Sequence, residues 1–87
     1  MYKIEYDRRV VKDIERLSKR DKQAIIEKIE ELAKEPRPFG VKPLKGEYAG
    51  YHRVRVGNYR IVYEIMDKKL VILILKIADR KDVYKFI

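Results

Sequence analysis

The chain has 87 residues, of which 46% are hydrophobic and 41% charged, and it contains one histidine and no cysteine. This length predicts a single domain over residues 1–87, because two smaller units would each bury too little apolar surface to offset chain entropy. The composition excludes disulfides and sites built on thiolates or histidine clusters, so we expect chemistry with no metal and no other cofactor.

The charge balance points to a polyanionic partner. Lysine and arginine number 22 against 14 aspartate and glutamate residues, a formal net charge of +8 that favours nucleic acid over anionic lipid. The longest apolar run, residues 70–75, is far shorter than the roughly 20 residues that cross a bilayer. No basic segment leads into an apolar stretch at the N-terminus, so we expect a soluble, cytoplasmic protein. The high charged fraction also suits a thermophile.

The N-terminal part of the chain is predicted to form a strand followed by two helices. Residues 2–6 alternate with the period of a strand. Asp7 offers an N-cap, and apolar residues recur at helical spacing over residues 8–17. A second amphipathic helix begins near Asp21 and ends before Pro36, which disfavours a helical residue ahead of it. We expect the two helices to form a hairpin.

Turn residues divide the middle of the chain. Prolines and glycines punctuate residues 36–50, which predicts a structured loop with no regular element. Residues 51–56 and 59–65 then alternate on either side of Gly57 and Asn58, the pattern of a β-hairpin with a two-residue turn.

The C-terminal part is predicted to complete the sheet. Residues 70–77 are apolar on both faces, as a central strand would be, and residues 80–87 are long enough for a short C-terminal helix. The order β-α-α-β-β-β therefore predicts an α+β fold. Its two N-terminal helices pack on one face of a small antiparallel sheet.

The hairpin carries the most informative pattern. A two-residue turn places Arg55 opposite Arg60 and Arg53 opposite Val62, with the three arginines on one side. The other side would pack beneath the helices and consists of Val54, Val56, Tyr59 and Ile61. Like charges directly opposite one another destabilise a strand pair, and a bound phosphate would resolve that conflict. The alternative is a solubilising role, with Glu64 pairing with one arginine.

The other polar candidates lie in the loop, the hairpin and the C-terminal segment. Arg80 and Tyr84 are four residues apart, so a helix would place both on one face, where arginines would lower the pKa of the phenol. The alternative for Tyr84 is a hydrophobic anchor. His52 falls on the face opposite the arginines, which favours a packing or hydrogen-bonding role over a role as general base. Lys42 and Lys45 are either solvated charge or an extension of an RNA-binding track.

These features together resemble a known family. The order of elements, the loop sequence Pro-Leu-Lys-Gly at residues 43–46, the hairpin at 51–63 and the ending at 79–84 are similar to those of the RelE/ParE superfamily of toxins from toxin–antitoxin pairs. The resemblance covers nearly the whole chain and is strongest to the RelE branch.

The resemblance implies an endoribonuclease, or mRNA interferase. Such a toxin enters the ribosomal A site and cleaves the codon there without a metal, by attack of the ribose 2′-hydroxyl on the adjacent phosphate. Family roles imply that Arg53, Arg55 and Arg60 contact the phosphate, that Arg80 stabilises its charge and that Tyr84 is the acid–base residue. The implied partner is a RelB-type antitoxin, in a heterodimer or heterotetramer, which covers the toxin and represses their operon.

Two departures from the family pattern bear on activity. Relatives carry lysines where this chain has Arg53 and Arg55, and arginine cannot act as a base because it keeps its proton. Relatives also have a histidine where this chain has Asp79, whose charge would oppose phosphate if it faced the site. Two other functions therefore stay open, namely a ParE-like inhibitor of DNA gyrase and a basic nucleic-acid-binding module without toxicity.

Overall fold

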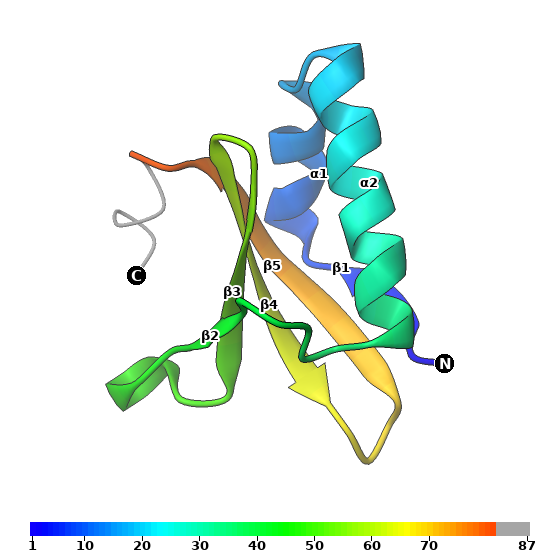
Figure 1. The fold of residues 1–87 in the computed structure, drawn as a ribbon, viewed down its shortest axis with the longest axis vertical. Coiled ribbons are helices and arrows are strands. Elements are labelled where there is room, and N and C mark those ends of the chain that lie inside the picture. The colour runs from blue at the N-terminus through cyan, green and yellow to red at the C-terminus, as the bar shows by residue number, and fades with distance from the viewer. Residues whose placement is uncertain (82–87) are drawn as a thin grey trace.

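The computed structural model describes residues 1–81 and confirms the predicted order of helices and long strands. The elements are β1 (Lys3–Tyr6), α1 (Arg8–Glu15), α2 (Lys19–Lys34), β2 (Lys42–Pro43), the 3-10 helix η1 (Gly46–Tyr48), β3 (Tyr51–Val56), β4 (Tyr59–Met66) and β5 (Val71–Asp79). The two helices lie side by side against one face of the sheet (Figure 1), as expected for an α+β fold. The C-terminal helix predicted over residues 80–87 falls almost entirely outside the described residues.

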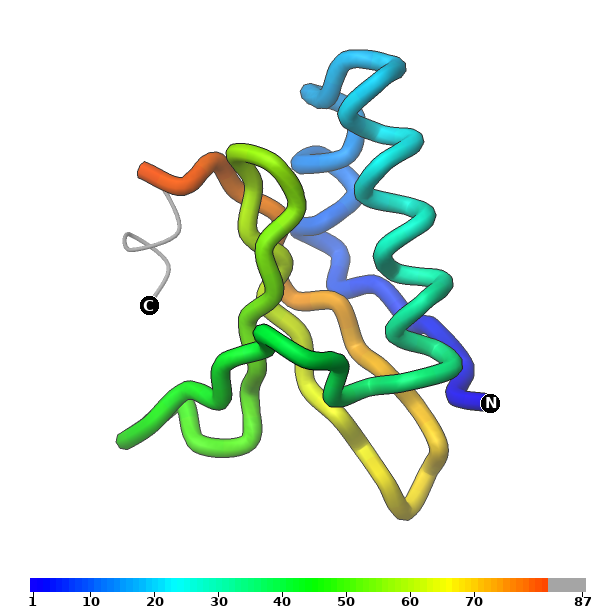
Figure 2. The backbone as a smooth tube through the Cα atoms, in the orientation of Figure 1, coloured from blue at the N-terminus to red at the C-terminus, as the bar shows by residue number. Residues whose placement is uncertain are grey.

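The sheet has five strands in the order β1-β5-β4-β3-β2. β5 lies inside the sheet between β1 and β4, as its two-sided apolar pattern predicts, although the middle strand of the five is β4; the last three strands form the expected antiparallel meander. β1 pairs with β5 in parallel, so the sheet is mixed and not wholly antiparallel. Figure 2 shows the chain crossing from β1 through both helices before it returns to the far edge of the sheet.

Side-chain caps set where the helices begin. Asp7 accepts a hydrogen bond from the Arg9 backbone N–H (3.0 Å) and starts α1, as predicted. Ser18 accepts one from the Asp21 N–H (3.1 Å), so α2 begins at Lys19, two residues before the predicted start near Asp21. The break in apolar pattern after α1 is therefore the cap of the next helix. Among residues 1–81, no helix is long and apolar enough to cross a membrane.

The main core lies between the helices and one face of the sheet. Its fully buried members include Val10, Ile25 and Leu32 from the helices and Ile61, Tyr63 and Ile74 from the sheet. Burial of a side chain of this size contributes about 1.5–3 kcal/mol to stability. A smaller apolar cluster of Val62, Leu75 and Ala78 lies on the opposite face.

The segment 36–50 is more regular than the sequence predicts. It contains β2 and η1, whereas its prolines and glycines predict a loop with no regular element. The prediction was wrong because pairing to β3 supplies hydrogen bonds that local sequence does not show. The start of the segment is anchored by the Tyr63 hydroxyl, which donates to the buried Pro36 carbonyl at 2.7 Å. Gly46 and Gly50 take positive φ angles of 69° and 98°, which other residues rarely adopt.

Candidate nucleic-acid interface

The β3–β4 hairpin presents three arginines on the face of the sheet that the helices leave uncovered. Arg55 pairs with Arg60 and Arg53 pairs with Val62, which confirms the predicted register. Because paired residues share a face, the guanidinium groups lie on the side opposite the main core. Lysines from neighbouring strands join them, and we call this surface the basic face: Lys42, Arg53, Arg55, Arg60 and Lys76.

Strand pairing brings the two lysines to the basic face. Lys42 in β2 pairs with Arg53, Arg53 pairs with Val62, and Val62 pairs with Lys76 in β5. This row crosses four strands and carries a cation on three of them. Neighbouring strands lie about 5 Å apart, so Lys42 and Arg53 are close enough to contact one phosphate group together.

The floor beneath these cations is apolar. Val62, Leu75 and Ala78 are buried, and three partly buried side chains pack against them: Leu44, Tyr51 and Leu73. Charges above an apolar floor interact more strongly than charges in bulk water, because the effective dielectric constant is lower. The basic face therefore suits the binding of an anion whose charge increases during a reaction.

Backbone hydrogen bonds position two of the arginines. Arg55 Nε donates to the Gly57 carbonyl at 3.1 Å, and Arg60 Nη1 donates to the Tyr59 carbonyl at 3.3 Å. Arg55 is exposed, whereas Arg53 and Arg60 are half-buried. A guanidinium group has five N–H donors, so the turn bond of Arg55 uses one of them.

A β-bulge decides which residues of β5 face the arginines. The pairing between β4 and β5 shifts between Val62 and Tyr63, where Leu75 is an extra residue. Because side chains alternate along a strand, one extra residue turns every later side chain to the opposite face. As a result, Ala78 lies directly opposite Arg60.

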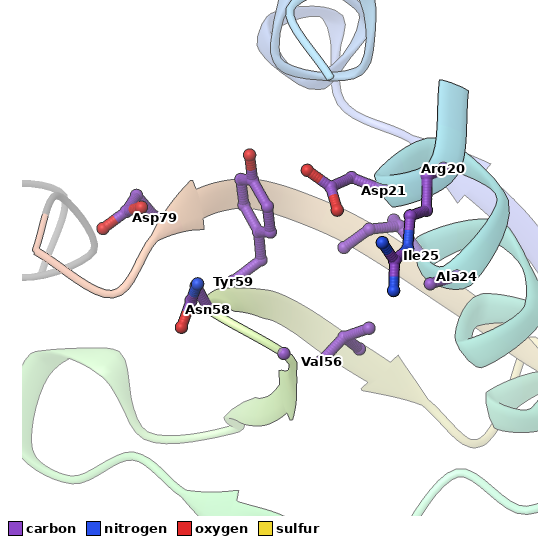
Figure 3. Close-up of a pocket in the computed structure, with 9 residues that line it drawn as sticks. Arg20, Asp21, Ala24, Ile25, Val56, Asn58, Tyr59 and Asp79 are labelled. Atoms are coloured by element: carbon purple, nitrogen blue, oxygen red, sulfur yellow. The ribbon is translucent and has the colours of Figure 1, made fainter. Parts of the chain in front are cut away.

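The bulge also turns Asp79 away from the basic face. Asp79 pairs with Tyr59 on the helix side of the sheet. Figure 3 shows the Tyr59 ring between Asp79 and Asp21, in a hollow of about 380 Å³ between the start of α2 and the hairpin turn. The carboxylate that would oppose phosphate if it faced the arginines does not face them.

The other predicted site residues lie outside the strand pairs that form the basic face or outside the described residues. Arg80 follows β5, and its backbone N–H donates to the Asn58 carbonyl at 2.8 Å, so it continues the ladder beside the hairpin turn. Its side chain is exposed. Lys45 is exposed beyond the end of β2 as the N-cap of η1, outside the strand pairs that build the basic face. Tyr84 lies outside the described residues, so its position relative to Arg80 is not part of the structure.

His52 lies on the helix side of the sheet, as the alternation predicts. Its ring stacks on Tyr63 at a centroid distance of 5.7 Å, and its buried Nδ1 has no hydrogen-bond partner among residues 1–81. Burial lowers the pKa of His52 below its ordinary value, and the positive charge of Arg37 lowers it further. Packing, and not proton transfer at the basic face, is therefore its role.

Several tyrosines resist ionisation. Burial raises the pKa of Tyr59, with further increases from Asp21 and Asp79, and burial also raises the pKa of Tyr63. The hydrogen bond to Asp67 raises the pKa of Tyr2. None of these three phenols lies on the basic face, so they are poor candidates for a general base there.

Comparison with known proteins identifies the family. The sequence matches the family described as the ParE toxin of the type II toxin–antitoxin system parDE over residues 4–84. The chain belongs to the RelE/ParE superfamily of toxins. It is 33% identical to toxin RelG of Mycobacterium tuberculosis over 85 residues, which cover 97% of both chains. It is 27% identical to the mRNA interferase toxin RelE of Escherichia coli over 86 residues, 95% of this chain and 90% of that protein.

A solved structure of this superfamily has the same fold. The archaeal RelE–RelB complex from Pyrococcus horikoshii OT3 contains a chain that superposes with a TM-score of 0.80 at 34% identity, covering 91% of this chain and 94% of that one. The predicted RelE-like α+β fold is thus confirmed.

Two residues near the basic face of this RelE/ParE toxin, Lys76 and Tyr51, were not predicted as site residues from the sequence. Lys76 is the only charged residue inside the apolar run of β5, and that isolated charge was the available signal. Tyr51 packs on the apolar floor and lies against Tyr48, with ring centroids 6.2 Å apart and ring planes tilted by 43°. Within residues 1–81, no three side chains of histidine, cysteine, aspartate or glutamate group together as metal ligands would.

Proposed function

We propose that this toxin is a ribosome-dependent mRNA endoribonuclease. The observation that carries the proposal is that Arg53, Arg55, Arg60 and Lys42 share one face of the sheet, above an apolar floor. Forked guanidinium donors match the oxygens of a phosphodiester and remain charged at any physiological pH. The mRNA interferase RelE of E. coli supports the same assignment at the level of the family.

The reaction is transesterification within the RNA strand. The 2′-oxygen of a ribose bonds to the adjacent phosphorus, the bond from phosphorus to the 5′-oxygen breaks, and a 2′,3′-cyclic phosphate and a 5′-hydroxyl result. The 2′-hydroxyl loses its proton to a base, and the leaving 5′-oxygen gains one. The guanidinium groups stabilise the extra negative charge on the phosphorane, so the proposed step needs no metal.

The residue roles follow from protonation chemistry. Arg53, Arg55 and Arg60 act as phosphate donors and electrostatic stabilisers, because arginine cannot accept a proton. Arg80, beside the hairpin turn, extends the same charge. We assign proton transfer to Tyr84, and Lys42 and Lys45 to the RNA backbone outside the scissile bond.

Partners follow from the same charge. An excess of eight positive charges favours the anionic environment of the ribosomal A site, where mRNA and ribosomal RNA meet. The RelE–RelB complex of P. horikoshii supports a RelB-type antitoxin as the natural partner, in a heterodimer or a heterotetramer. The proposed setting is a single-domain cytoplasmic toxin.

Primer-extension mapping of mRNA in a translating extract tests the proposal. The wild-type protein should make cuts phased with codons, and Arg60→Ala or Tyr84→Phe should reduce the rate of cutting by about 10²-fold or more. Lys22→Gln, which removes an exposed lysine of α2, should cut at the wild-type rate. Intact message in the presence of folded toxin would reject the nuclease.

The same preparation tests a gyrase inhibitor, which the ParE description of the family brings into consideration. If mRNA stays intact while purified gyrase loses its supercoiling activity, the gyrase function replaces the nuclease. If neither message nor supercoiling changes, a basic nucleic-acid-binding module remains.

A further inference from the structure

A second cluster of cations lies on α1, outside the basic face. It lines a shallow hollow of about 460 Å³ whose walls are all charged side chains: Arg8, Arg9, Lys12, Asp13, Arg16 and Lys76. From the sequence alone, these helical cations are predicted to be ordinary solvent-exposed charges. The structure shows that they converge on one depression.

The one acidic residue in the hollow is already engaged inside the protein. Asp13 is only 8% exposed, its Oδ1 lies 3.1 Å from Lys76 Nζ and its Oδ2 accepts the Ile77 backbone N–H at 3.1 Å. Asp13 contacts the edge of β5 at Ile77, beyond Ile74, which is the last β5 residue that pairs with β1. Since both oxygens are used, Asp13 does not neutralise the cations along the rim.

Three of those cations form a row. Arg8, Lys12 and Arg16 recur every four residues, so they follow one side of the helix at steps of about 6 Å. All three are exposed, and none takes part in an ion pair among residues 1–81. Each keeps its donors available for an external anion.

The hollow continues into the basic face. Lys76 links the two through its strand position, since it pairs with Val62 in the strand row while its Nζ reaches Asp13 in the hollow. On the helix, the pKa of Arg9 is raised chiefly by its hydrogen bond with Asp7, with smaller electrostatic contributions from Tyr51 and Asp13. The Arg9 guanidinium lies beside Asp7, with its Nε 3.0 Å from Asp7 Oδ1.

We propose that this hollow on α1 is a second, non-catalytic site that binds the phosphodiester backbone of RNA beside the cleavage site. The inference rests on the proposed function and adds to it a contact outside the scissile bond. An RNA strand that leaves the basic face past Lys76 meets the row of Arg8, Lys12 and Arg16. Its phosphates then bind the exposed donors of that row.

The lining of the hollow favours RNA over an acidic protein. The cores of protein–protein interfaces are depleted in charged residues and rich in aromatic and apolar ones. Protein–nucleic acid interfaces are more polar and far more positively charged. Every side chain in the lining ends in a charged group, although the aliphatic stems of these side chains also form part of the wall, so the row of exposed cations is the feature that matches a phosphate backbone.

Binding of a non-cleavable RNA tests the site independently of catalysis. The probe is a fluorescein-labelled oligoribonucleotide with 2′-O-methyl groups, which lacks the attacking hydroxyl, and its affinity is measured over a range of KCl concentrations. The test variant is the triple change Arg8→Gln, Lys12→Gln and Arg16→Gln. The matched control, Lys22→Gln, Lys34→Gln and Lys68→Gln, removes the same charge from exposed residues outside the hollow.

The expected result is a difference between the two triple variants. Each phosphate contact to a single strand contributes about 0.7 to the slope of log affinity against log salt concentration, so the α1 variant should lose about 2 from that slope. At low salt its dissociation constant should rise at least about tenfold above that of the control variant. The single change Lys12→Gln should lose about 0.7, which keeps the test valid if the triple variant does not fold.

Equal slopes and affinities for the two triple variants would overturn the inference. The assignment would also fail if the α1 variant bound RNA like the control but lost its co-purifying antitoxin, since the hollow would then be a protein site. The outcome of this binding test is independent of the outcome of the mRNA-cutting test. A wild-type protein that makes no codon-phased cuts rejects the nuclease even if the α1 slope changes, whereas cutting with an unchanged slope rejects only the second site.

Discussion

Arg55 stands directly opposite Arg60 in the β3–β4 ladder, so two guanidinium groups of like charge share one face of the hairpin. Such a pair destabilises a strand pair by up to about 1 kcal/mol relative to a neutral one. Two neighbouring arginines in this arrangement are most stable when a phosphate or a similar anion lies between them.

The first prediction concerns this pair. Arg55→Gln removes one of the two like charges at an exposed position, so its free energy of unfolding should exceed that of the wild type by a few tenths of a kcal/mol, up to about 1, at low ionic strength. Adding millimolar sulfate should stabilise the wild type more than the variant, because the anion binds between the arginines. Urea unfolding with and without sulfate measures both effects. Equal stabilisation of both proteins by sulfate would argue against an anion site.

The second prediction concerns the two neighbours Ala78 and Asp79. Asp79→Asn should leave the rate of mRNA cutting within about threefold of the wild type, since its carboxylate lies on the helix side of the sheet. Ala78→Asp places a carboxylate opposite Arg60 on the basic face and should reduce cutting by about 10²-fold. Primer extension measures the rates, and circular dichroism checks that both variants fold. The reverse order of effects would contradict the assignment of Ala78 to the basic face and of Asp79 to the helix side.

The third prediction concerns Asp13, which binds Lys76 and the Ile77 backbone. Asp13→Ala leaves a buried N–H without a partner, so the free energy of unfolding should fall by about 1–3 kcal/mol. Asp13→Asn keeps an acceptor and should lose less. Glu15→Ala, an exposed change on the same helix, provides the control and should stay within about 0.5 kcal/mol of the wild type. Urea unfolding decides, and equal effects at both positions would contradict the role of Asp13.

The fourth prediction concerns pH. Burial lowers the pKa of His52 in the folded protein, and Arg37 lowers it further against smaller opposing contributions from the Gly50 backbone and Asp67. The unfolded chain then binds a proton near pH 6.5 that the folded protein binds only at lower pH. The stability from the neutral ring is present in full above about pH 7 and is lost as the pH falls below that range through the lowered pKa of the folded protein.

His52→Phe tests this dependence. The substitution keeps a ring stacked on Tyr63 but removes the titrating group. We expect the variant to lose less stability than the wild type between about pH 7 and about pH 5, as measured by urea unfolding at each pH. Asp7 and Asp67 have lowered pKa values, through hydrogen bonds with Arg9 and Arg37 respectively, so they act below this range. Parallel pH profiles for the two proteins would exclude His52 as the cause.

Much of this protein could be read from local sequence. The hairpin register follows from a two-residue turn at Gly57 and Asn58 and from strand alternation, so the opposition of Arg55 and Arg60 was predictable. The start of α1 follows from Asp7, whose side chain satisfies a backbone N–H of the first turn. Both depend on contacts between residues close in sequence.

Other parts were decided only by the tertiary structure. Lys42 reaches Arg53 because the loop pairs with the edge of β3, a contact that no local pattern encodes. Lys76 pairs with Val62 in the strand row of Arg53, although its Nζ binds Asp13 on α1, and Asp79 lies on the helix side, because the extra residue Leu75 shifts the register of β5. A one-residue shift reverses the face of every side chain that follows, and only the packing of β5 between β1 and β4 determines where it occurs.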